Sequence, residues 1–358
     1  MESINFLVRV SCMTYNHAPY IVDAMNGFTM QQTTFPFVCI IVDDASIDGE
    51  PEVISNYMRE NFDFADKAIA IEEETDDYRL MFARHKSNLN CFFVAVLLKY
   101  NHYSINKPKH PYYMRWVGAK YIALCEGDDY WCDPEKLQKQ VDYLEEHEDC
   151  GMVYTSYRLH NEMTNDESIV RTSEGIPHDN NFKWRLLEQK VLIGTCTVLI
   201  RRQLQISMSA FKDDFKNFLM GDTQTWFNAA RLSNIGYIPD VTGVYRKQYT
   251  GATATFDPSR RAKFIRGCLD LHLHLAYKYG APRETVERIK SLFGFTCFNL
   301  YYRIGDYKGA EKLNHDWFND NKIISFINNI VKMLKLKQIH GLGTILRSSV
   351  KLGLIQLG

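Results

Sequence analysis

Residues 121–137 read YIALCEGDDYWCDPEKL, and the character of the chain changes twice within them. A short apolar run at 121–125 meets an acidic turn, EGDDYW, and Asp133-Pro134 follow. Aspartate and proline are favoured at the cap and first turn of a helix, and apolar residues then recur at helical spacing at Leu137, Val141 and Leu144. The stretch predicts a buried strand, an acidic turn and an amphipathic helix.

The N-terminal region repeats this plan. Residues 7–13 (LVRVSCM) and 37–42 (FVCIIV) are apolar runs rich in β-branched residues, and a polar turn follows each. Such runs are typical of strands buried in a parallel sheet. Residues 20–32 have helical spacing, and Pro51 is placed to open a second helix. The chain therefore begins with two strand–helix units.

Further strands and helices are predicted along the remainder of the chain. Strand-like segments lie at 151–156, 195–201 and near 241–246, a helix lies at about 222–232, and only helical patterns follow residue 259. Two polar stretches, 101–115 and 158–182, are predicted to be loops. We expect an α/β fold with a mostly parallel central sheet flanked by helices and a C-terminal helical extension.

Composition excludes several classes of protein. The 358 residues are 46% hydrophobic. The 42 basic and 43 acidic side chains nearly cancel in net charge, so we expect no general attraction to nucleic acid. The nine scattered cysteines form no CxxC pair, which favours a reducing compartment. The N-terminus does not resemble a signal peptide and no apolar run could span a bilayer, so a cytoplasmic location is expected.

Polar residues follow three of the predicted strands, where open α/β sheets bind ligands. Asp128 and Asp129 could bind a divalent cation together with a diphosphate, although an isolated pair of aspartates is more often a solvated turn. Asp43 and Asp44 could hydrogen-bond a ribose or a base, and Tyr15 could stack on a base; a self-satisfied turn and a core aromatic are the alternatives. Asp222 begins a predicted helix, which suits either a general base or an N-cap.

Together these motifs resemble those of the bacterial family 2 glycosyltransferases of GT-A fold. The resemblance covers about residues 7–250, and its most specific part is EGDDYWCDPEKL at 126–137. Residues 84–89 are similar to the family's segment before a helix that leads to the metal motif, and residues 118–122 to its approach to that motif. Tyr245-Arg246 and the small residues 250–253 resemble the closing segment near the diphosphate. Asn90, where the family usually has glycine, and the long 101–115 stretch depart from the pattern.

The resemblance implies a role for each matching residue. Asp129, with Asp128, would bind Mg²⁺ or Mn²⁺, Asp128 could also contact the ribose, and Asp222 would deprotonate the acceptor hydroxyl in an inverting transfer. Contacts to the nucleotide-sugar donor are implied for Thr14, Tyr15, Asn16, Asp43, Asp44, Arg84, Asp128, Tyr245 and Arg246. Residues 1–256 would form the GT-A domain, with a nucleotide-sugar half of about 1–133 and an acceptor half of about 134–256, before an extension at 257–358.

The function implied is transfer of a sugar, from a UDP-sugar most readily, to a glycan or lipid-linked acceptor in cell-surface polysaccharide synthesis. Two alternatives stay open: a non-catalytic nucleotide-sugar-binding or scaffold protein on the same fold, and a sugar nucleotidyltransferase. The latter usually needs a glycine-rich basic loop after the first strand, whereas this chain has TYNHAPY. A dinucleotide oxidoreductase is disfavoured because no G-x-G-x-x-G follows that strand.

The C-terminal residues 321–358 combine basic and apolar side chains and contain no Asp or Glu. This composition favours peripheral contact with the inner face of the plasma membrane. A helix packed on its own domain is the alternative, and Gly341 and Gly343 would interrupt any long continuous helix.

Overall fold

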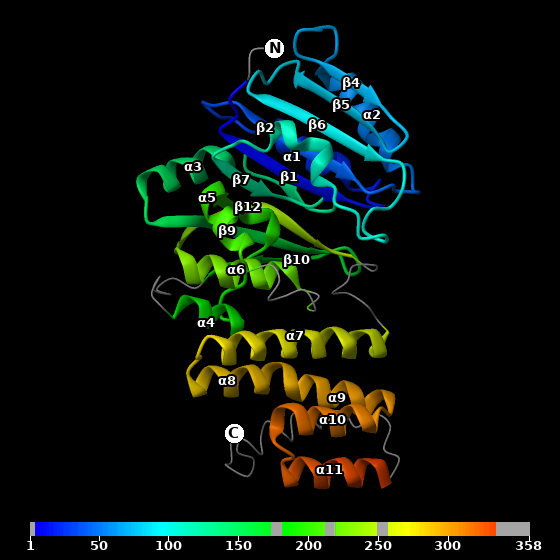
Figure 1. The fold of residues 1–358 in the computed structure, drawn as a ribbon, viewed down its shortest axis with the longest axis vertical. Coiled ribbons are helices and arrows are strands. Elements are labelled where there is room, and N and C mark those ends of the chain that lie inside the picture. Colours follow the sequence, from blue (N-terminus) through cyan, green and yellow to red (C-terminus); the bar gives the residue numbers. More distant parts are fainter. Residues whose placement is uncertain (1–3, 173–180, 212–217, 219, 249–256, 334–358) are drawn as a thin grey trace. The chain divides into compact units, whose positions relative to one another are not determined.

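The computed structural model describes residues 4–172, 181–211, 218, 220–248 and 257–333. They form two compact units (Figure 1), which are described separately. The sheet unit comprises Met1–Asp179, Leu192–Phe211 and Asn228–Arg246, and the helical unit comprises Asn180–Val191, Lys212–Phe227 and Lys247–Gly358. The division of the chain at residue 256 stays a prediction.

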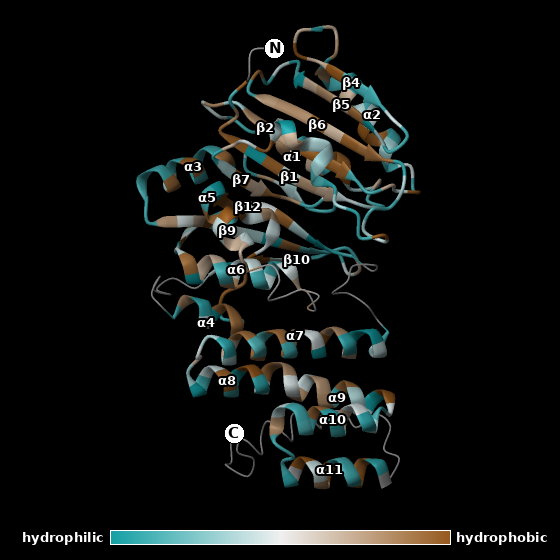
Figure 2. Cartoon of the chain, in the orientation of Figure 1, coloured by the Kyte–Doolittle hydropathy of each residue, from teal (hydrophilic) through white to brown (hydrophobic). Residues whose placement is uncertain are grey.

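Four parallel strands form the middle of a 12-stranded sheet. Their order across the sheet is β6 (Cys91–Leu98), β2 (Phe37–Asp43), β1 (Val8–Thr14) and β7 (Tyr121–Leu124). Every residue of β2 and β6 is buried, because both faces of these strands are covered. Figure 2 shows the hydrophobic character of this central region. The predicted strands at 7–13, 37–42 and 121–125 are confirmed.

Antiparallel pairs extend the sheet on both sides, so parallel pairing is confined to its middle. Strand β5 (Tyr78–His85) pairs with β6, and the short strands β3 (Phe62–Asp63) and β4 (Ile71–Glu74) pair with β5. On the other side β11 (Leu199–Arg201) pairs antiparallel with β7 and with β9 (Cys150–Asn161). Strand β12 (Asn234–Lys247) lies beside β9 and pairs antiparallel with β8 (Tyr130–Trp131).

Alternation along the central strands separates the two faces of the sheet. Val10 and Cys39 belong to one core cluster with residues of α1 (Ile21–Thr29), α2 (Glu50–Asn61) and α3 (Lys136–Glu146). Val38 and Ile40 belong to a second cluster with Trp116 of the 3₁₀ segment η1 (His110–Trp116). Since successive side chains of a strand point to opposite faces, helices cover one face and η1 contributes to covering the other.

Several local predictions differ from the structure. The segment 84–89, which the resemblance places before a helix, is followed first by the strand at 91–98, because CFFVAVLL is apolar at every position and fills a buried place between β2 and β5. Helix α3 begins at Lys136 after Glu135, not at Asp133-Pro134. Asp133 instead accepts hydrogen bonds from the Glu135 N–H and the Lys139 ammonium. Pro51 is the second residue of α2 and not the first, since the helix begins at Glu50 after the N-cap Gly49.

The two predicted loops are partly ordered into regular elements. Within 101–115, residues from His110 onward form η1. Within 158–182, β9 continues to Asn161 and turns back into β10 (Asp166–Val170), which pairs with it antiparallel. The polar composition of this hairpin reflects its exposed outer strand, since four of the five β10 residues are exposed. Residues 173–180 lie outside the described part.

In the helical unit, helices follow residue 257, as predicted. They are α7 (Pro258–Lys278), α8 (Arg283–Ile289), the π segment η4 (Lys290–Gly294), α9 (Phe295–Ile304), α10 (Tyr307–Phe318) and α11 (Lys322–Met333). α4 (Phe182–Leu187) and the beginning of α6 (Gly221–Leu232) also belong to this unit, whereas η2 (Thr195–Thr197) and α5 (Arg202–Ser209) belong to the sheet unit. Among the described helices, none is long and apolar enough to cross a membrane.

Candidate active site

The turns that follow β1, β2 and β7 lie at one edge of the sheet. Thr14, the last residue of β1, is paired in register with Asp43, the last residue of β2. Beyond β7, the main-chain N–H groups of Cys125 and Gly127 donate to the carbonyl oxygens of Ser11 and Met13 of β1. The turns therefore adjoin one another at the carboxyl ends of the parallel strands, where α/β sheets bind ligands.

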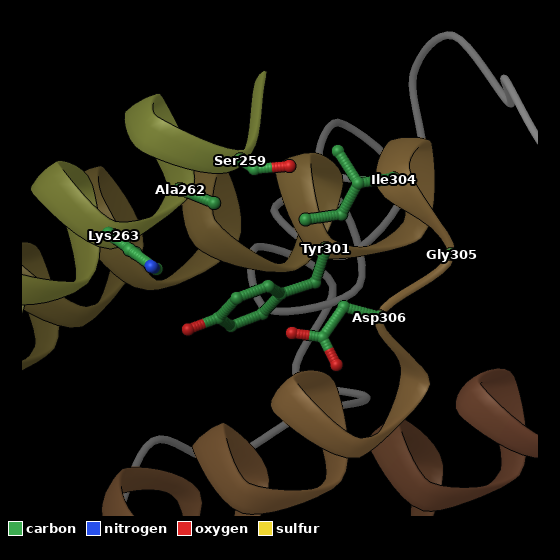
Figure 3. A pocket seen from close by; sticks show the side chains of 7 residues that line it. All are labelled: Ser259, Ala262, Lys263, Tyr301, Ile304, Gly305 and Asp306. Atoms are coloured by element: carbon green, nitrogen blue, oxygen red, sulfur yellow. The ribbon is translucent and has the colours of Figure 1, made fainter. Parts of the chain in front are cut away.

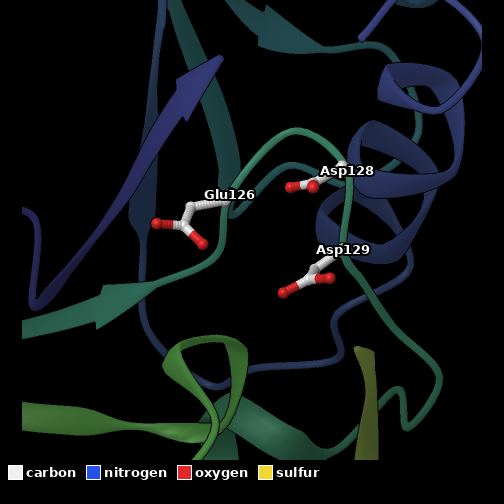
Figure 4. Close-up of side chains that lie close together, drawn as sticks. All are labelled: Glu126, Asp128 and Asp129. Atoms are coloured by element: carbon white, nitrogen blue, oxygen red, sulfur yellow. The ribbon is translucent and has the colours of Figure 1, made fainter. Parts of the chain in front are cut away.

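An acidic cluster occupies the turn between β7 and β8. Glu126, Asp128 and Asp129 each offer one carboxylate oxygen, and these oxygens lie within 4.8 Å of one another. Figure 4 shows the three carboxylates facing a shared space. Glu126 is exposed, Asp128 is half-buried and Asp129 is 1% exposed. Burial and the neighbouring charge of Asp128 raise the pKa of Asp129 well above its ordinary value.

The buried Asp129 fits the requirements of a cation ligand. Its Oδ1 accepts a hydrogen bond from the Arg246 N–H at 2.8 Å, and its Oδ2 has no hydrogen-bond partner among the described residues. An unpaired buried carboxylate oxygen is costly, and a hard divalent cation, which prefers oxygen ligands, would offset that cost. The residues present therefore fit Mg²⁺ or Mn²⁺.

Arg246 binds the acidic turn from β12. Its Nη1 donates to the Asp128 carbonyl at 3.0 Å, and its guanidinium pairs with Asp23 and, at 3.1 Å, with Glu162. The guanidinium also lies over the Tyr130 ring, 4.5 Å from its centroid. The side chain is 9% exposed. These contacts commit Arg246 to protein groups, so the structure favours a positioning role over the donor contact that the resemblance implies.

A buried carboxylate that the sequence analysis did not select joins the first two turns. Glu50 accepts hydrogen bonds from the Thr14 hydroxyl, the His17 N–H at 2.9 Å and the Ser46 hydroxyl at 2.9 Å. The His17 Nε2 lies 3.8 Å from Asp128 Oδ2. In the sequence Glu50 has the ordinary position of an acidic residue in the first turn of a helix, which conceals this role.

Asn16 is held by hydrogen bonds to a neighbouring turn, whereas Tyr15 is exposed. Asn16 has a φ of 58°, its N–H donates to Ser46 Oγ and its Oδ1 accepts from the Ile47 N–H. It therefore ties the turn after β1 to the turn after β2. The Tyr15 ring is 44% exposed at the same edge, as a ring available for stacking on a base would be.

Asp43 and Asp44 are both buried but have different surroundings. Asp43 Oδ2 accepts from the Ser46 N–H, whereas its Oδ1 has no hydrogen-bond partner among the described residues. Burial raises the pKa of Asp43 to about 6. Asp44 accepts from the N–H groups of His102 and Tyr103 and pairs with Lys109 at 2.7 Å. Burial alone would raise the pKa of Asp44, but these partners lower it below its ordinary value.

Arg84 lies at the opposite edge of the sheet from the acidic turn. It pairs in register with Phe92 near the beginning of β6, which in turn lies opposite Val38 near the beginning of β2. Its guanidinium is 3.8 Å from Asp66. The structure therefore does not bring Arg84 to the site. Tyr245 lies beside Tyr157, with ring centroids 6.3 Å apart, and residues 250–253 lie outside the described part.

Asp222 is in the first turn of α6 and belongs to the helical unit. Its side chain is exposed, and its Oδ1 accepts from the Thr223 N–H at 2.7 Å. A helix N-terminus favours a negative charge at this place. The role of Asp222 as general base stays a prediction.

The helical unit contains a separate pocket of about 370 Å³, shown in Figure 3. Ser259, Ala262 and Lys263 of α7 line one part of it, and residues of α9 and the following turn line the rest: Tyr301, Ile304, Gly305 and Asp306. One carboxylate oxygen of Asp306 already accepts from the Gly309 N–H at the start of α10. None of the predicted site residues lines this pocket.

This chain is distantly similar in sequence to several known proteins. No protein-family model matches it. An uncharacterized protein of Mycobacterium tuberculosis is 29% identical over 250 residues, which are 68% of this chain and 60% of that protein. A proposed teichuronic acid biosynthesis glycosyltransferase of Bacillus subtilis, TuaG, is 25% identical over 201 residues, which are 55% of this chain and 63% of that protein. The match thus spans less than two thirds of the length of either relative.

Among solved structures, S. aureus TarS 1–349 in complex with UDP aligns with a TM-score of 0.49 at 14% identity. The alignment covers 98% of this chain and 96% of that chain. The sequence match to TuaG confirms the resemblance that the motifs indicate. By its motifs, its mixed α/β sheet and this relative, the chain is similar to the family 2 glycosyltransferases of GT-A fold.

Proposed function

We propose that this chain is a metal-dependent, inverting glycosyltransferase of hexosyltransferase type. It transfers a sugar from a nucleotide-sugar, most readily a UDP-sugar, to a hydroxyl of a glycan or lipid-linked acceptor. The observation that carries the proposal is the acidic turn at the carboxyl ends of β1, β2 and β7, in which the buried Asp129 has an oxygen without a hydrogen-bond partner among the described residues.

Asp129 and Asp128 would hold Mg²⁺ or Mn²⁺ in this proposal, with Glu126 close enough to contribute. Such an ion, when bound, offsets the negative charge that develops on the departing nucleoside diphosphate. The chain's own groups do the rest of the positioning. Arg246 fixes the acidic turn, and Glu50 joins the turn after β1 to the turn after β2.

The transfer itself is an in-line displacement at the anomeric carbon. The acceptor oxygen forms a bond to that carbon while the bond to the diphosphate oxygen breaks, and the electron pair leaves with the nucleoside diphosphate. Asp222 takes the proton from the acceptor hydroxyl. Because attack and departure occur on opposite faces of the sugar, the anomeric configuration inverts.

The proposal extends to the acceptor class and to the place of action. TuaG, by its name, is assigned to teichuronic acid biosynthesis, which supports a role in cell-surface polysaccharide synthesis. The inner face of the plasma membrane is proposed as the place of action from the basic and apolar composition of residues 321–358. Residues 321–358 would provide peripheral membrane contact. Within the described part of this segment, Ile324 and Val331 of α11 are buried and Lys332 pairs with Glu311 of α10; residues 334–358 lie outside it.

The proposal is tested by thermal shift with UDP, GDP and dTDP, each with Mn²⁺, with Mg²⁺ and with chelator. A ligand that binds the folded state raises its apparent stability by mass action. We expect one nucleotide to stabilise the wild type only when metal is present, and Asp129→Asn to abolish this shift. If none stabilises the wild type and no nucleotide-sugar is hydrolysed, the scaffold alternative is favoured. Unchanged binding to anionic liposomes after deletion of 321–358 would contradict the membrane contact.

A further inference from the structure

The segment after β6, residues 99–109, is held beside the candidate nucleotide site by a buried carboxylate. Asp44 Oδ1 accepts from the His102 N–H at 2.8 Å, and Oδ2 accepts from the Tyr103 N–H at 3.1 Å and pairs with Lys109 at 2.7 Å. The Asn101 side-chain amide donates to the Asp44 carbonyl. Since Asp44 directly follows β2, these bonds attach the segment to the carboxyl end of that strand.

A second network of contacts holds the same segment. The carboxylate of Asp77 accepts from the Tyr100 hydroxyl at 2.7 Å and pairs with Lys107 at 3.2 Å. The His102 ring stacks on Tyr100 at a centroid distance of 4.7 Å, and its Nε2 lies 3.0 Å from the Tyr112 hydroxyl. Polar groups on both sides of Tyr103 are therefore engaged with neighbouring parts of the sheet unit.

Within this anchored segment Tyr103 is nevertheless 83% exposed. The Asp44 N–H donates to the Thr14 carbonyl, so the peptide that joins Thr14 to Tyr15 also adjoins Asp44. The main chain at Tyr103 and the main chain just before Tyr15 therefore each make a hydrogen bond with Asp44, and both tyrosines are exposed. Asp43, the residue before Asp44, has a buried Oδ1 with no hydrogen-bond partner among the described residues.

We propose that Tyr103 is a nucleobase contact of the donor site, presented by the segment that Asp44 anchors. This inference rests on the proposed function. The acidic turn follows β7 and Asp43 ends β2, so they are separated by two strand spacings, roughly 10 Å. A nucleotide bound through its diphosphate at the acidic turn extends across β1 and brings its base to Asp43. There an N–H of the base satisfies the Asp43 carboxylate, and the planar base packs against the tyrosine rings.

Binding measurements with two ligands test the role of Tyr103. Calorimetric titrations with the nucleoside diphosphate that stabilises the wild type, and with inorganic pyrophosphate, are made in Mn²⁺ for wild type, Tyr103→Ala, Tyr103→Phe and Leu89→Ala. Leu89 is 63% exposed next to the beginning of β6, at the opposite edge of the sheet, and serves as the matched surface control. Because the Tyr103 side chain is exposed, its replacement should leave the thermal midpoint unchanged.

We expect Tyr103→Ala to weaken the nucleotide roughly tenfold, the order of a lost base–aromatic stack, and to leave pyrophosphate binding unchanged. Tyr103→Phe and Leu89→Ala should bind the nucleotide within about twofold of wild type, since Phe keeps the ring that stacks. Wild-type nucleotide affinity in Tyr103→Ala, or an equal loss for both ligands, overturns the inference while leaving the proposed function intact. Failure of the wild type to bind any nucleotide overturns both.

Discussion

The main-chain N–H of Arg246 donates a 2.8 Å hydrogen bond to Oδ1 of Asp129, across 117 positions of sequence. Through this bond, and through the guanidinium bond to the Asp128 carbonyl, the end of β12 determines how the acidic turn presents its carboxylates. The other Asp129 oxygen has no hydrogen-bond partner among the described residues. The metal-binding capacity that we propose therefore depends on two distant parts of the chain.

Substitution of Arg246 should disturb the acidic turn. Arg246→Ala leaves Asp23 and Glu162 without their shared cation and removes the bond to Asp128. Because both carboxylates are partly solvated, we expect a loss of about 1–3 kcal/mol in the free energy of unfolding. We also expect roughly tenfold weaker Mn²⁺ binding, measured by electron paramagnetic resonance. Arg246→Lys should recover part of both effects, and unchanged Mn²⁺ affinity in Arg246→Ala would contradict the positioning role.

Gly27 allows α1 to approach the backbone of the segment that follows the acidic turn. A Cβ at this position would lie 2.8 Å from the Trp131 N and 2.9 Å from the Trp131 O. Since backbone atoms cannot move aside as a side-chain tip can, Gly27→Ala should lower the free energy of unfolding by about 2 kcal/mol or more. Gly118→Ala, where nothing lies within 4 Å of the new Cβ, should change it by less than about 0.5 kcal/mol. Equal denaturation midpoints for the two variants would show that the contact is not close.

Asp43→Asn should stabilise the ligand-free protein at neutral pH. Burial raises the pKa of Asp43 from 3.8 to about 6, so its contribution to stability is present below pH 3.8 and is lost as the pH rises through 6. At pH 7.5 the buried carboxylate is charged, and replacing it with an amide should add about 1–3 kcal/mol to the free energy of unfolding.

The gain in Asp43→Asn should vanish near pH 4, in urea titrations made from pH 4 to 7.5. The Asp43→Asn variant should also bind the nucleotide more weakly than the wild type, since the Asp43 carboxylate would accept a hydrogen bond from the nucleoside. A stability difference of the same size at every pH would contradict the titration of this residue.

Asp222→Asn should separate chemistry from donor binding. Without a base for the acceptor proton, we expect kcat to fall by about 10²–10⁴-fold, while metal-dependent nucleotide binding stays at the wild-type level. The matched control is Asp257→Asn, because Asp257 caps α7 through the Ser259 N–H and asparagine caps a helix equally well. Assays of sugar transfer would contradict the assignment of the base if Asp222→Asn retained wild-type turnover.

Much of the fold could be predicted because the deciding patterns are local. LVRVSCM, FVCIIV and YIALC are short apolar runs that end in polar turns, and these became β1, β2 and β7. The run CFFVAVLL is equally apolar, but its neighbour β5 approaches from the antiparallel direction, and no local pattern marks that pairing. The hairpin of β9 and β10 was obscured for a related reason, since its exposed polar strand has the composition of a loop.

The sequence by itself determined which chemical groups are available: the carboxylates of EGDDYW, the aspartates that end β2 and the strands that carry them to one edge. These follow from spacing and composition, because parallel strands place their carboxyl ends together. Only the tertiary structure decided how each group is used. Asp43 has an oxygen without a hydrogen-bond partner among the described residues, whereas Asp44 binds residues 102, 103 and 109. Arg84 lies at the far edge of the sheet. Glu50 accepts hydrogen bonds from both of the first two turns. A hydrogen bond requires two groups to meet in space, and for residues distant in sequence that meeting depends on the fold as a whole.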